Sequence, residues 1–197
     1  RQARRRMNAS CEAQLRGYAD LIQRWNPAIN LVAPSTLDDL WNRHIVDSTQ
    51  LADLAPAAGT WLDIGSGGGL PGVVVAICRP DLAVTLLDSD ARKATFLRTC
   101  VRELQLPNCR VKTDRIERHP PAGVDHVSAR ALAPMPKLMP YVVRHLRPGG
   151  TAWLMKGENW KAEVEFVNTS WHFDLREHPS RTQLGAAILE LTDIRHG

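Results

Sequence analysis

Long apolar runs are missing from this sequence of 197 residues. No uninterrupted run approaches the roughly 18 apolar residues that a membrane-spanning helix needs. The beginning of the chain, "RQARRRMNAS", has no apolar segment behind its arginines and therefore lacks the pattern of a secretory signal. These absences predict a cytoplasmic protein that makes no membrane contact.

Cysteine is sparse, and its spacing does not suit a metal site. The chain has four cysteines, and no two of them stand in a C-x-x-C motif, the usual spacing of zinc and iron-sulfur ligands. Two of them fall inside apolar segments that resemble core. The four are Cys11, Cys78, Cys100 and Cys109. We therefore expect no metal and no disulfide framework.

The remaining composition is that of an ordinary globular chain. Hydrophobic residues make up 44% of it and charged residues 23%, which suffices for one core, so we predict a single domain over residues 1–197. The net charge is +4. Basic residues gather at Arg1, Arg4, Arg5 and Arg6, and again at Arg92, Lys93, Arg98 and Arg102. This pattern suits a polyanionic partner, and it fits a solvated helix face with a basic tail equally well.

From residue 60 onward, strand-like segments alternate with helical ones. The strand-like segments are 60–64, 83–89, 109–114, 124–130 and 151–157, and the helical ones are 72–79, 91–105 and 138–146. This alternation is typical of a parallel sheet with helical crossovers. The last two segments, 172–178 and 187–194, are joined by a polar turn too short for a crossover helix. We expect them to form an antiparallel pair that closes the sheet.

The chain before residue 60 is helical in character. An apolar stripe along residues 15–25 predicts a first helix that ends at the Asn26-Pro27 pair. A second helix is predicted over residues 41–54. We therefore expect an N-terminal helical extension over 1–54 that precedes a core over 60–197.

The segment "GSGGGLPG", residues 65–72, puts five glycines into eight residues. Glycine tolerates positive φ and lets a ligand lie directly on the backbone, while the N-terminus of the following helix favours an anionic group. The alternative is a plain turn between strand and helix. Asp88 ends the next strand, where a carboxylate accepts hydrogen bonds from the ribose hydroxyls of a nucleotide-like cofactor.

Several kinds of nucleotide site use such a loop. No G-K-[ST] follows it, which excludes a P-loop ATPase. A nicotinamide dinucleotide fold needs two mononucleotide halves, and this chain leaves little room for a catalytic domain beside them. Asp63 in "LDIG" and the antiparallel ending resemble instead the Rossmann-like α/β fold of class I S-adenosylmethionine-dependent methyltransferases. S-adenosyl-L-methionine is therefore the expected cofactor, and residues 60–197 are the expected cofactor-binding core.

Two motifs common among methyltransferases are absent. Enzymes that attack exocyclic amines usually carry Asn or Asp, two prolines and an aromatic residue after the fourth strand, where this chain has "SARALAP". Enzymes that methylate a cytosine carbon need a cysteine nearby, and none follows Cys109. A ring nitrogen such as guanine N7 carries a lone pair and no proton, so its methylation needs alignment and no general base.

The segments "RHIVDS", "DIGSGGGLPG", "LLDS", "SARALAP" and "LMKG" occur in this order. In order and spacing they resemble the RsmG (GidB) family of small-subunit ribosomal RNA guanine-N7 methyltransferases, from about Leu21 to the end of the chain. The family usually has Thr and Ala or Pro where this chain has Ser66 and Gly68, and often Ser in place of Ala129. The resemblance implies methylation of small-subunit ribosomal RNA or of the ribosomal subunit, and we expect a monomer.

The resemblance also implies roles for individual residues. Cofactor contacts are expected at Gly65, Gly67, Gly69 and Leu70 of the loop, at Asp88 on the ribose, at Ile116 and Glu117 beside the adenine, and at Arg130. For the glycines the alternative role is the plain turn. For Asp88 it is the N-cap of the helical segment that starts at Asp90, and for Ile116 it is a place in the core.

Catalytic roles are expected for Arg43, His44 and Lys156. Arg43 and His44 lie in "RHIVDS", on a helix expected to cross the cofactor mouth near the target RNA. The alternative is an i,i+4 ion pair between Arg43 and Asp47 on a solvated face. Lys156 in "LMKG" ends the fifth strand, at the edge where such sheets bind ligands, and the alternative for it is an ordinary surface lysine.

Two other functions remain open at this point. A methyltransferase of small molecules shares the cofactor half of the site and predicts turnover that is insensitive to salt. A non-catalytic RNA-binding module predicts RNA affinity without cofactor affinity, and the glycine loop with Asp88 disfavours it.

Overall fold

The computed structural model describes residues 9–197, so the predicted arginine cluster at Arg1, Arg4, Arg5 and Arg6 lies outside the described residues. Four helical elements come first: α1 (Ala9–Ile29), the 3-10 helix η1 (Pro34–Asp39), the π-helix η2 (Trp41–Val46) and α2 (Asp47–Leu54). Among the described helices, none is both long and apolar enough to cross a bilayer.

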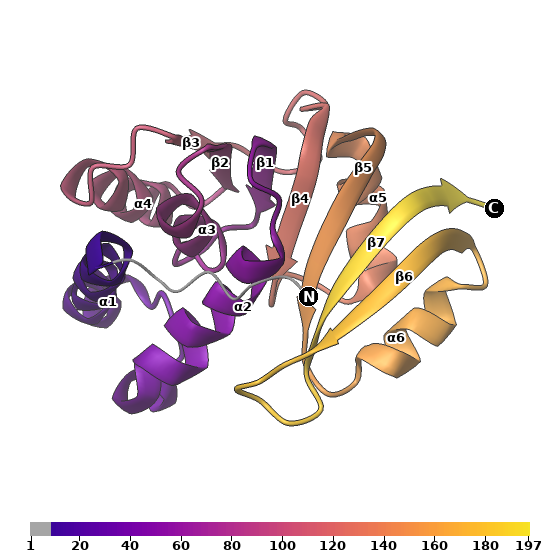
Figure 1. The fold of residues 1–197 in the computed structure, drawn as a ribbon. Helices are drawn as coiled ribbons and strands as arrows, with labels where there is room; N and C mark the ends of the chain where they lie inside the picture. The colour runs from indigo at the N-terminus through magenta and orange to yellow at the C-terminus, as the bar shows by residue number, and fades with distance from the viewer. Residues whose placement is uncertain (1–8) are drawn as a thin grey trace.

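The rest of the chain alternates strands and helices (Figure 1). The elements are β1 (Gly59–Ile64), α3 (Gly72–Cys78), β2 (Leu82–Asp88), α4 (Ala91–Glu103), β3 (Cys109–Thr113), β4 (Val124–Arg130), α5 (Met135–His145), β5 (Leu146–Lys156), α6 (Trp160–Val167), β6 (Trp171–Pro179) and β7 (Ala187–His196).

The strands form one seven-stranded sheet in the order β3-β2-β1-β4-β5-β7-β6. The first five strands in that order pair in parallel, whereas β7 is antiparallel to both β5 and β6. The predicted fold class, with its closing antiparallel pair, is thereby confirmed. The order reverses direction between β1 and β4, and open α/β sheets bind ligands at such a switch point, beyond the carboxyl ends of the strands.

Each face of the sheet carries its own apolar core. Trp61, Leu86 and Trp153 point to the face that α1, α2, α3 and α4 cover. Leu62 and Leu154 point to the opposite face, which α5 and α6 cover. Neighbouring residues of one strand thus pack on opposite sides, as the period of two along a strand requires. Figure 1 shows the two groups of helices on either side of the sheet.

Several helical elements differ from the prediction: η1 was not expected, α5 begins at Met135 and not at residue 138, and α1 and α6 also differ. Helix α1 does not end at Asn26 but continues to Ile29, with Pro27 inside its last turn. The Asn26 side chain is buried and bonds the chain beyond the helix, accepting from the Val32 N–H at 2.8 Å and donating to the Val32 carbonyl at 3.2 Å. Helix α6 was not predicted at all, because its eight residues form a pattern too short to stand out between two strands.

The glycine loop between β1 and α3 is shaped by close packing. Gly65 has φ +61°, and a Cβ there would lie 2.5 Å from Cδ1 of Leu132. At Gly69, with φ +88°, a Cβ would lie 2.5 Å from Cγ2 of Val73 and 2.9 Å from the Tyr18 hydroxyl. These two positions require glycine both for conformation and for space.

We predict that Gly65→Ala lowers the free energy of unfolding more than Gly123→Ala does. Gly123 is a matched control, since its φ of +59° is nearly the same and a Cβ there would meet nothing within 4 Å. Both variants suffer the strain of alanine in the left-handed region, about 1–2 kcal/mol. Only Gly65→Ala also displaces Leu132, which adds about 1–3 kcal/mol of overpacking. Urea denaturation measures the difference, and equal losses would contradict this assignment of the contact.

Candidate active site

A cavity of about 710 Å³ lies beyond the carboxyl ends of β1, β2, β3 and β4. The glycine loop, the segment after β2 and the segment after β4 form its walls, and residues 31–33 of the N-terminal region close one side. The sequence-predicted residues that line it are His44, Gly65, Gly67, Leu70, Asp88, Ile116, Glu117 and Arg130. Gly69, Arg43 and Lys156 do not line it.

Asp88 holds the loop as well as lining the cavity. One carboxylate oxygen accepts a hydrogen bond from the Gly67 N–H at 2.7 Å, and the other accepts from the Asp90 N–H at 2.8 Å. The N-cap of α4 is Asp90, whose side chain accepts from the backbone N–H groups of Arg92 and Lys93. The capping role considered for Asp88 therefore belongs to Asp90, and Asp88 points its carboxylate at the loop and the cavity.

Gly67 and Gly69 have different surroundings. Gly67 has φ +54°. Beyond its chain neighbours, the nearest atom to an added Cβ there is the Gly65 carbonyl oxygen, at 3.9 Å. Gly67 therefore presents bare backbone to the cavity, whereas Gly69 is pressed against α1 and α3. The expected cofactor contact at Gly69 is not what its position supports, and we propose a packing role for it.

The N-terminal helices shape the cavity from behind. The Tyr18 hydroxyl, buried in α1, donates to the Gly68 carbonyl at 2.5 Å. The backbone and Cβ of Leu31 lie 3.2 Å from where a Gly68 Cβ would stand. Asn26 anchors Val32, which lines the cavity. The loop is thus held by side chains from a region that the glycine motif does not include.

Ile116 and Glu117 follow β3 and line the side of the cavity next to Asp88. Ile116 also belongs to the core on the α5 face, so it packs in the core and lines the cavity at the same time. His145, fully buried at the end of α5, donates from Nε2 to the Ile116 carbonyl at 2.9 Å and fixes this segment. His145 is a positioning residue that sequence reasoning missed, because no motif marks it.

Arg130 lies at the end of β4, where the side chains of η2 and α2 meet it. Its guanidinium donates to Nδ1 of His44 at 2.9 Å and to the Arg43 carbonyl at 3.2 Å, and it lies 3.7 Å from Oδ2 of Asp47. Because Nδ1 of His44 accepts, its Nε2 carries the proton and donates to the Thr36 hydroxyl at 2.7 Å. Burial and the neighbouring Arg130 lower the pKa of His44 to about 4.

Arg43 contributes its backbone, not its side chain, to the surroundings of Arg130. Its side chain is exposed and lines neither of the cavities described here, and Asp47 pairs with Arg130 instead of forming the i,i+4 pair with Arg43. The π-helical turn of η2 places the Arg43 carbonyl, rather than its side chain, on Arg130.

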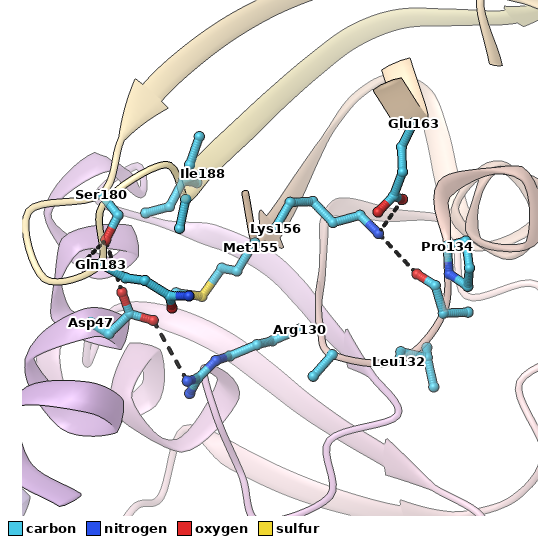
Figure 2. A pocket seen from close by; sticks show the side chains of 15 residues that line it. Asp47, Arg130, Leu132, Pro134, Met155, Lys156, Glu163, Ser180, Gln183 and Ile188 are labelled. Carbon is cyan, nitrogen blue, oxygen red and sulfur yellow. Dashed lines mark hydrogen bonds and ion pairs between the residues drawn. The ribbon is translucent and has the colours of Figure 1, made fainter. Parts of the chain in front are cut away.

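A second cavity, of about 420 Å³, adjoins the first (Figure 2). Residues 130–133 line both cavities, so this segment forms their common wall. Lys156 lines the second cavity, with its side chain only 10% exposed and Nζ 2.7 Å from Oε2 of Glu163. Nζ also donates to the Ala133 carbonyl at 2.9 Å. Lys156 is therefore neither a surface lysine nor a part of the larger cavity.

The loop between β6 and β7 closes the second cavity on the side of α2. Oδ1 of Asp47 accepts hydrogen bonds from Thr182 at 2.7 Å and Ser180 at 3.3 Å. Gln50 accepts from the Arg181 N–H at 2.7 Å. Figure 2 shows Asp47 directed at this loop and at Arg130. These contacts join residues more than 100 positions apart, and no local motif indicated them.

Comparison with known proteins places these features in a family. The family model described as rRNA small subunit methyltransferase G (GidB) matches residues 11–192. The chain belongs to this family. A ribosomal RNA small subunit methyltransferase G of Paracoccus denitrificans is 55% identical over 192 residues, which are 96% of this chain and 100% of that protein. One from a Ruegeria species is 47% identical over 181 residues, which are 90% and 88% of the two chains.

Solved structures of more distant proteins share the fold of this GidB family member. A SAM-dependent methyltransferase from Aquifex aeolicus aligns with a TM-score of 0.60 at 13% identity, over 89% of this chain and 97% of that one. M. jannaschii TYW2 in complex with AdoMet aligns with a TM-score of 0.59 at 11% identity, over 78% of this chain and 76% of that one. At such identities the likeness concerns the fold alone.

We predict that His44 makes stability depend on pH in mildly acidic solution. The unfolded chain protonates His44 near pH 6.5, whereas in the folded protein its pKa is about 4, so the folded state binds fewer protons between these values. The stability due to neutral His44 is therefore complete above pH 6.5 and is lost as the pH falls toward 4.

Thermal denaturation of the GidB family member and its His44→Asn variant over this interval measures the effect. The melting temperature of the original protein should fall more steeply with decreasing pH than that of the variant. Contributions from His126 and His145, whose pKa values burial also lowers, are common to both proteins and cancel. Parallel curves would show that His44 does not carry the effect.

Proposed function

We propose that this protein transfers the methyl group of S-adenosylmethionine to N7 of a guanine in small-subunit ribosomal RNA. The observation that carries the proposal is the junction of two cavities at residues 130–133, one floored by the glycine loop and the other lined by charged side chains. Methyl transfer needs a donor and an acceptor in direct contact, and two cavities that share residues 130–133 put their binding places next to one another. Family membership supplies the class of acceptor, because the relatives are named for the small-subunit RNA.

The residues of the larger cavity fit S-adenosylmethionine. Gly67 presents bare backbone, Asp88, a residue that is 8% exposed, presents its carboxylate, and Ile116 presents an apolar surface for a planar base. Asp88 would hold the ribose hydroxyls, and Gly65 and Leu70 would contact the cofactor from the loop. S-adenosylmethionine supplies an electrophilic methyl group on a sulfonium. A volume of about 710 Å³ lies in the range of cofactor pockets.

Arg130 stands where donor and acceptor would meet. His44, Asp47 and the Arg43 carbonyl all contact one terminal nitrogen of its guanidinium, which holds this end of the side chain before any ligand binds. Neutral His44 accepts from Arg130 and therefore supports the cation without adding charge. We propose that Arg43 and His44 act as positioning residues for Arg130, in place of the catalytic roles first expected for them.

Methylation of guanine N7 requires no group that removes a proton, because N7 carries only a lone pair. The chain's task is to align the base, exclude water and accommodate the charge that moves onto it. The pair of Lys156 and Glu163 would orient the base in the second cavity. Lys156 already bonds Glu163 and the Ala133 carbonyl, which limits its freedom to reach the guanine O6.

Basic side chains at the larger cavity suit an RNA substrate. Lys93, Arg115 and Lys137 line that cavity. Cationic side chains in such positions attract phosphates, and binding that depends on them weakens steeply as salt rises. A methyltransferase of small molecules, the second candidate function, would show no such salt dependence.

Labelled S-adenosylmethionine and unmethylated small ribosomal subunits test the proposal. After incubation, nuclease digestion of the RNA and mass spectrometry should find the label in N7-methylguanosine. Label on another base atom, or only on small metabolites, would contradict the proposed function.

An Asp88→Asn variant belongs in the same experiment. We predict that it binds S-adenosylmethionine roughly 10- to 100-fold more weakly, the loss expected for one charged hydrogen bond. Calorimetric titration measures the affinity, and Asp81→Asn, an exposed aspartate at the far end of β2, is the control. Unchanged affinity would assign Asp88 to loop support alone.

A further inference from the structure

Two carboxylates, Asp47 and Glu163, line the second cavity. They differ in how many of their oxygen atoms already have partners within the protein. Asp47 uses Oδ1 for Thr182, Ser180 and Gln50 and directs Oδ2 to Arg130. Both of its oxygens therefore face partners within the protein. Asp47 serves to tie the β6–β7 loop and Arg130 to α2.

Glu163, on α6, keeps one oxygen available. Lys156 Nζ lies 2.7 Å from its Oε2, and the Met135 N–H donates to the same Oε2 at 2.7 Å. Within residues 9–197, Oε1 accepts no hydrogen bond. The side chain is 27% exposed, and it lines the cavity. Figure 2 shows it above Lys156, on the wall opposite Asp47 and Gln183.

We propose that Glu163 is the residue that selects guanine, by accepting hydrogen bonds at its free oxygen from N1–H and the N2 amino group of the acceptor base. The inference rests on the proposed function and deepens it. Guanine places these two donors side by side, whereas adenine has an unprotonated N1 that a carboxylate repels. Contact at this edge also leaves N7, on the other side of the base, open to the methyl group.

The same contact favours the transfer step. A bond forms between the N7 lone pair and the methyl carbon while the methyl carbon–sulfur bond breaks, so the positive charge of the sulfonium passes to the guanine ring and no proton moves. The N1 and N2 protons become more acidic as this charge develops. A carboxylate bonded to them therefore binds the transition state more tightly than the ground state.

Lys156 and the N-terminus of α5 hold this carboxylate in advance. Two donors on Oε2 fix the orientation of the carboxylate plane, so Oε1 has a defined direction before the base enters. Preorganisation of this kind spares the cost of ordering a charged side chain during the reaction. Lys156 is then a positioning residue for Glu163. This role explains why the Lys156 side chain is only 10% exposed.

Small subunits rebuilt with one altered nucleotide test the proposal. The methylated guanosine is first located in the RNA with the original protein, and subunits are then assembled from RNA that carries inosine there. Inosine keeps N7, O6 and N1–H but lacks the N2 amino group. Single-turnover methyl transfer and subunit binding are measured for the original protein, Glu163→Ala, Glu163→Gln and the control Glu165→Gln. Glu165 is an exposed residue of the same helix that lines neither cavity.

We expect the original protein and Glu165→Gln to transfer methyl to guanosine roughly 10- to 100-fold faster than to inosine, as the loss of one charged hydrogen bond implies. Glu163→Ala and Glu163→Gln should be slower by a similar factor on guanosine. Glu163→Ala should no longer distinguish the two bases. Binding of S-adenosylmethionine and of subunits should stay within a few-fold of the original.

A purely structural role for Glu163 would slow transfer to guanosine and inosine by the same factor, and that result would overturn the inference. Full activity of Glu163→Ala on guanosine would overturn it as well. If the original protein places no methyl group on guanine N7, the proposed function fails and the inference fails with it. The two failures are therefore distinguishable.

Discussion

The site depends on a buried carboxylate at the end of β1. Asp63 is 1% exposed and accepts hydrogen bonds from the hydroxyls of Ser66 at 2.8 Å and Ser128 at 2.6 Å, and from the Gly72 N–H at 3.3 Å. Burial raises its pKa to about 6, and the three donors offset part of this penalty. One side chain thus joins the start of the glycine loop, its end and the neighbouring strand β4. The loop keeps its open backbone because Asp63 ties it down on both sides.

Two cavities that share residues 130–133 lie next to the loop that Asp63 holds. The glycine loop and Asp88 shape the larger one, while β4 carries Arg130 to the boundary between them. The N-terminal helices then fix Arg130 through His44 and Asp47, and Asp47 in turn holds the β6–β7 loop. The N-terminal helices and the β6–β7 loop therefore meet at Asp47 and Arg130, beside both cavities.

Local patterns in the sequence predicted the sheet, the glycine loop and Asp88, because strand alternation and glycine conformation are properties of short segments. They could not assign the partners of Lys156, since Glu163 lies on a short helix with no distinctive pattern, and an ion pair depends on how two elements pack. The i,i+4 pair of Arg43 and Asp47, an alternative that the spacing left open, does not form for a similar reason: the π-helical turn and the approach of Arg130 decide which side chain Asp47 meets. Tertiary contacts of this kind leave little trace in local sequence.

Donor and acceptor are expected to meet beside residues 130–133, which line both cavities. A crystal structure of the protein with S-adenosylhomocysteine tests this expectation most directly. The adenosine should lie against the glycine loop, with its ribose on Asp88, and the sulfur should point toward residues 130–133 and the second cavity. A ligand whose sulfur faces away from residues 130–133, or one that occupies the second cavity instead, would contradict the account.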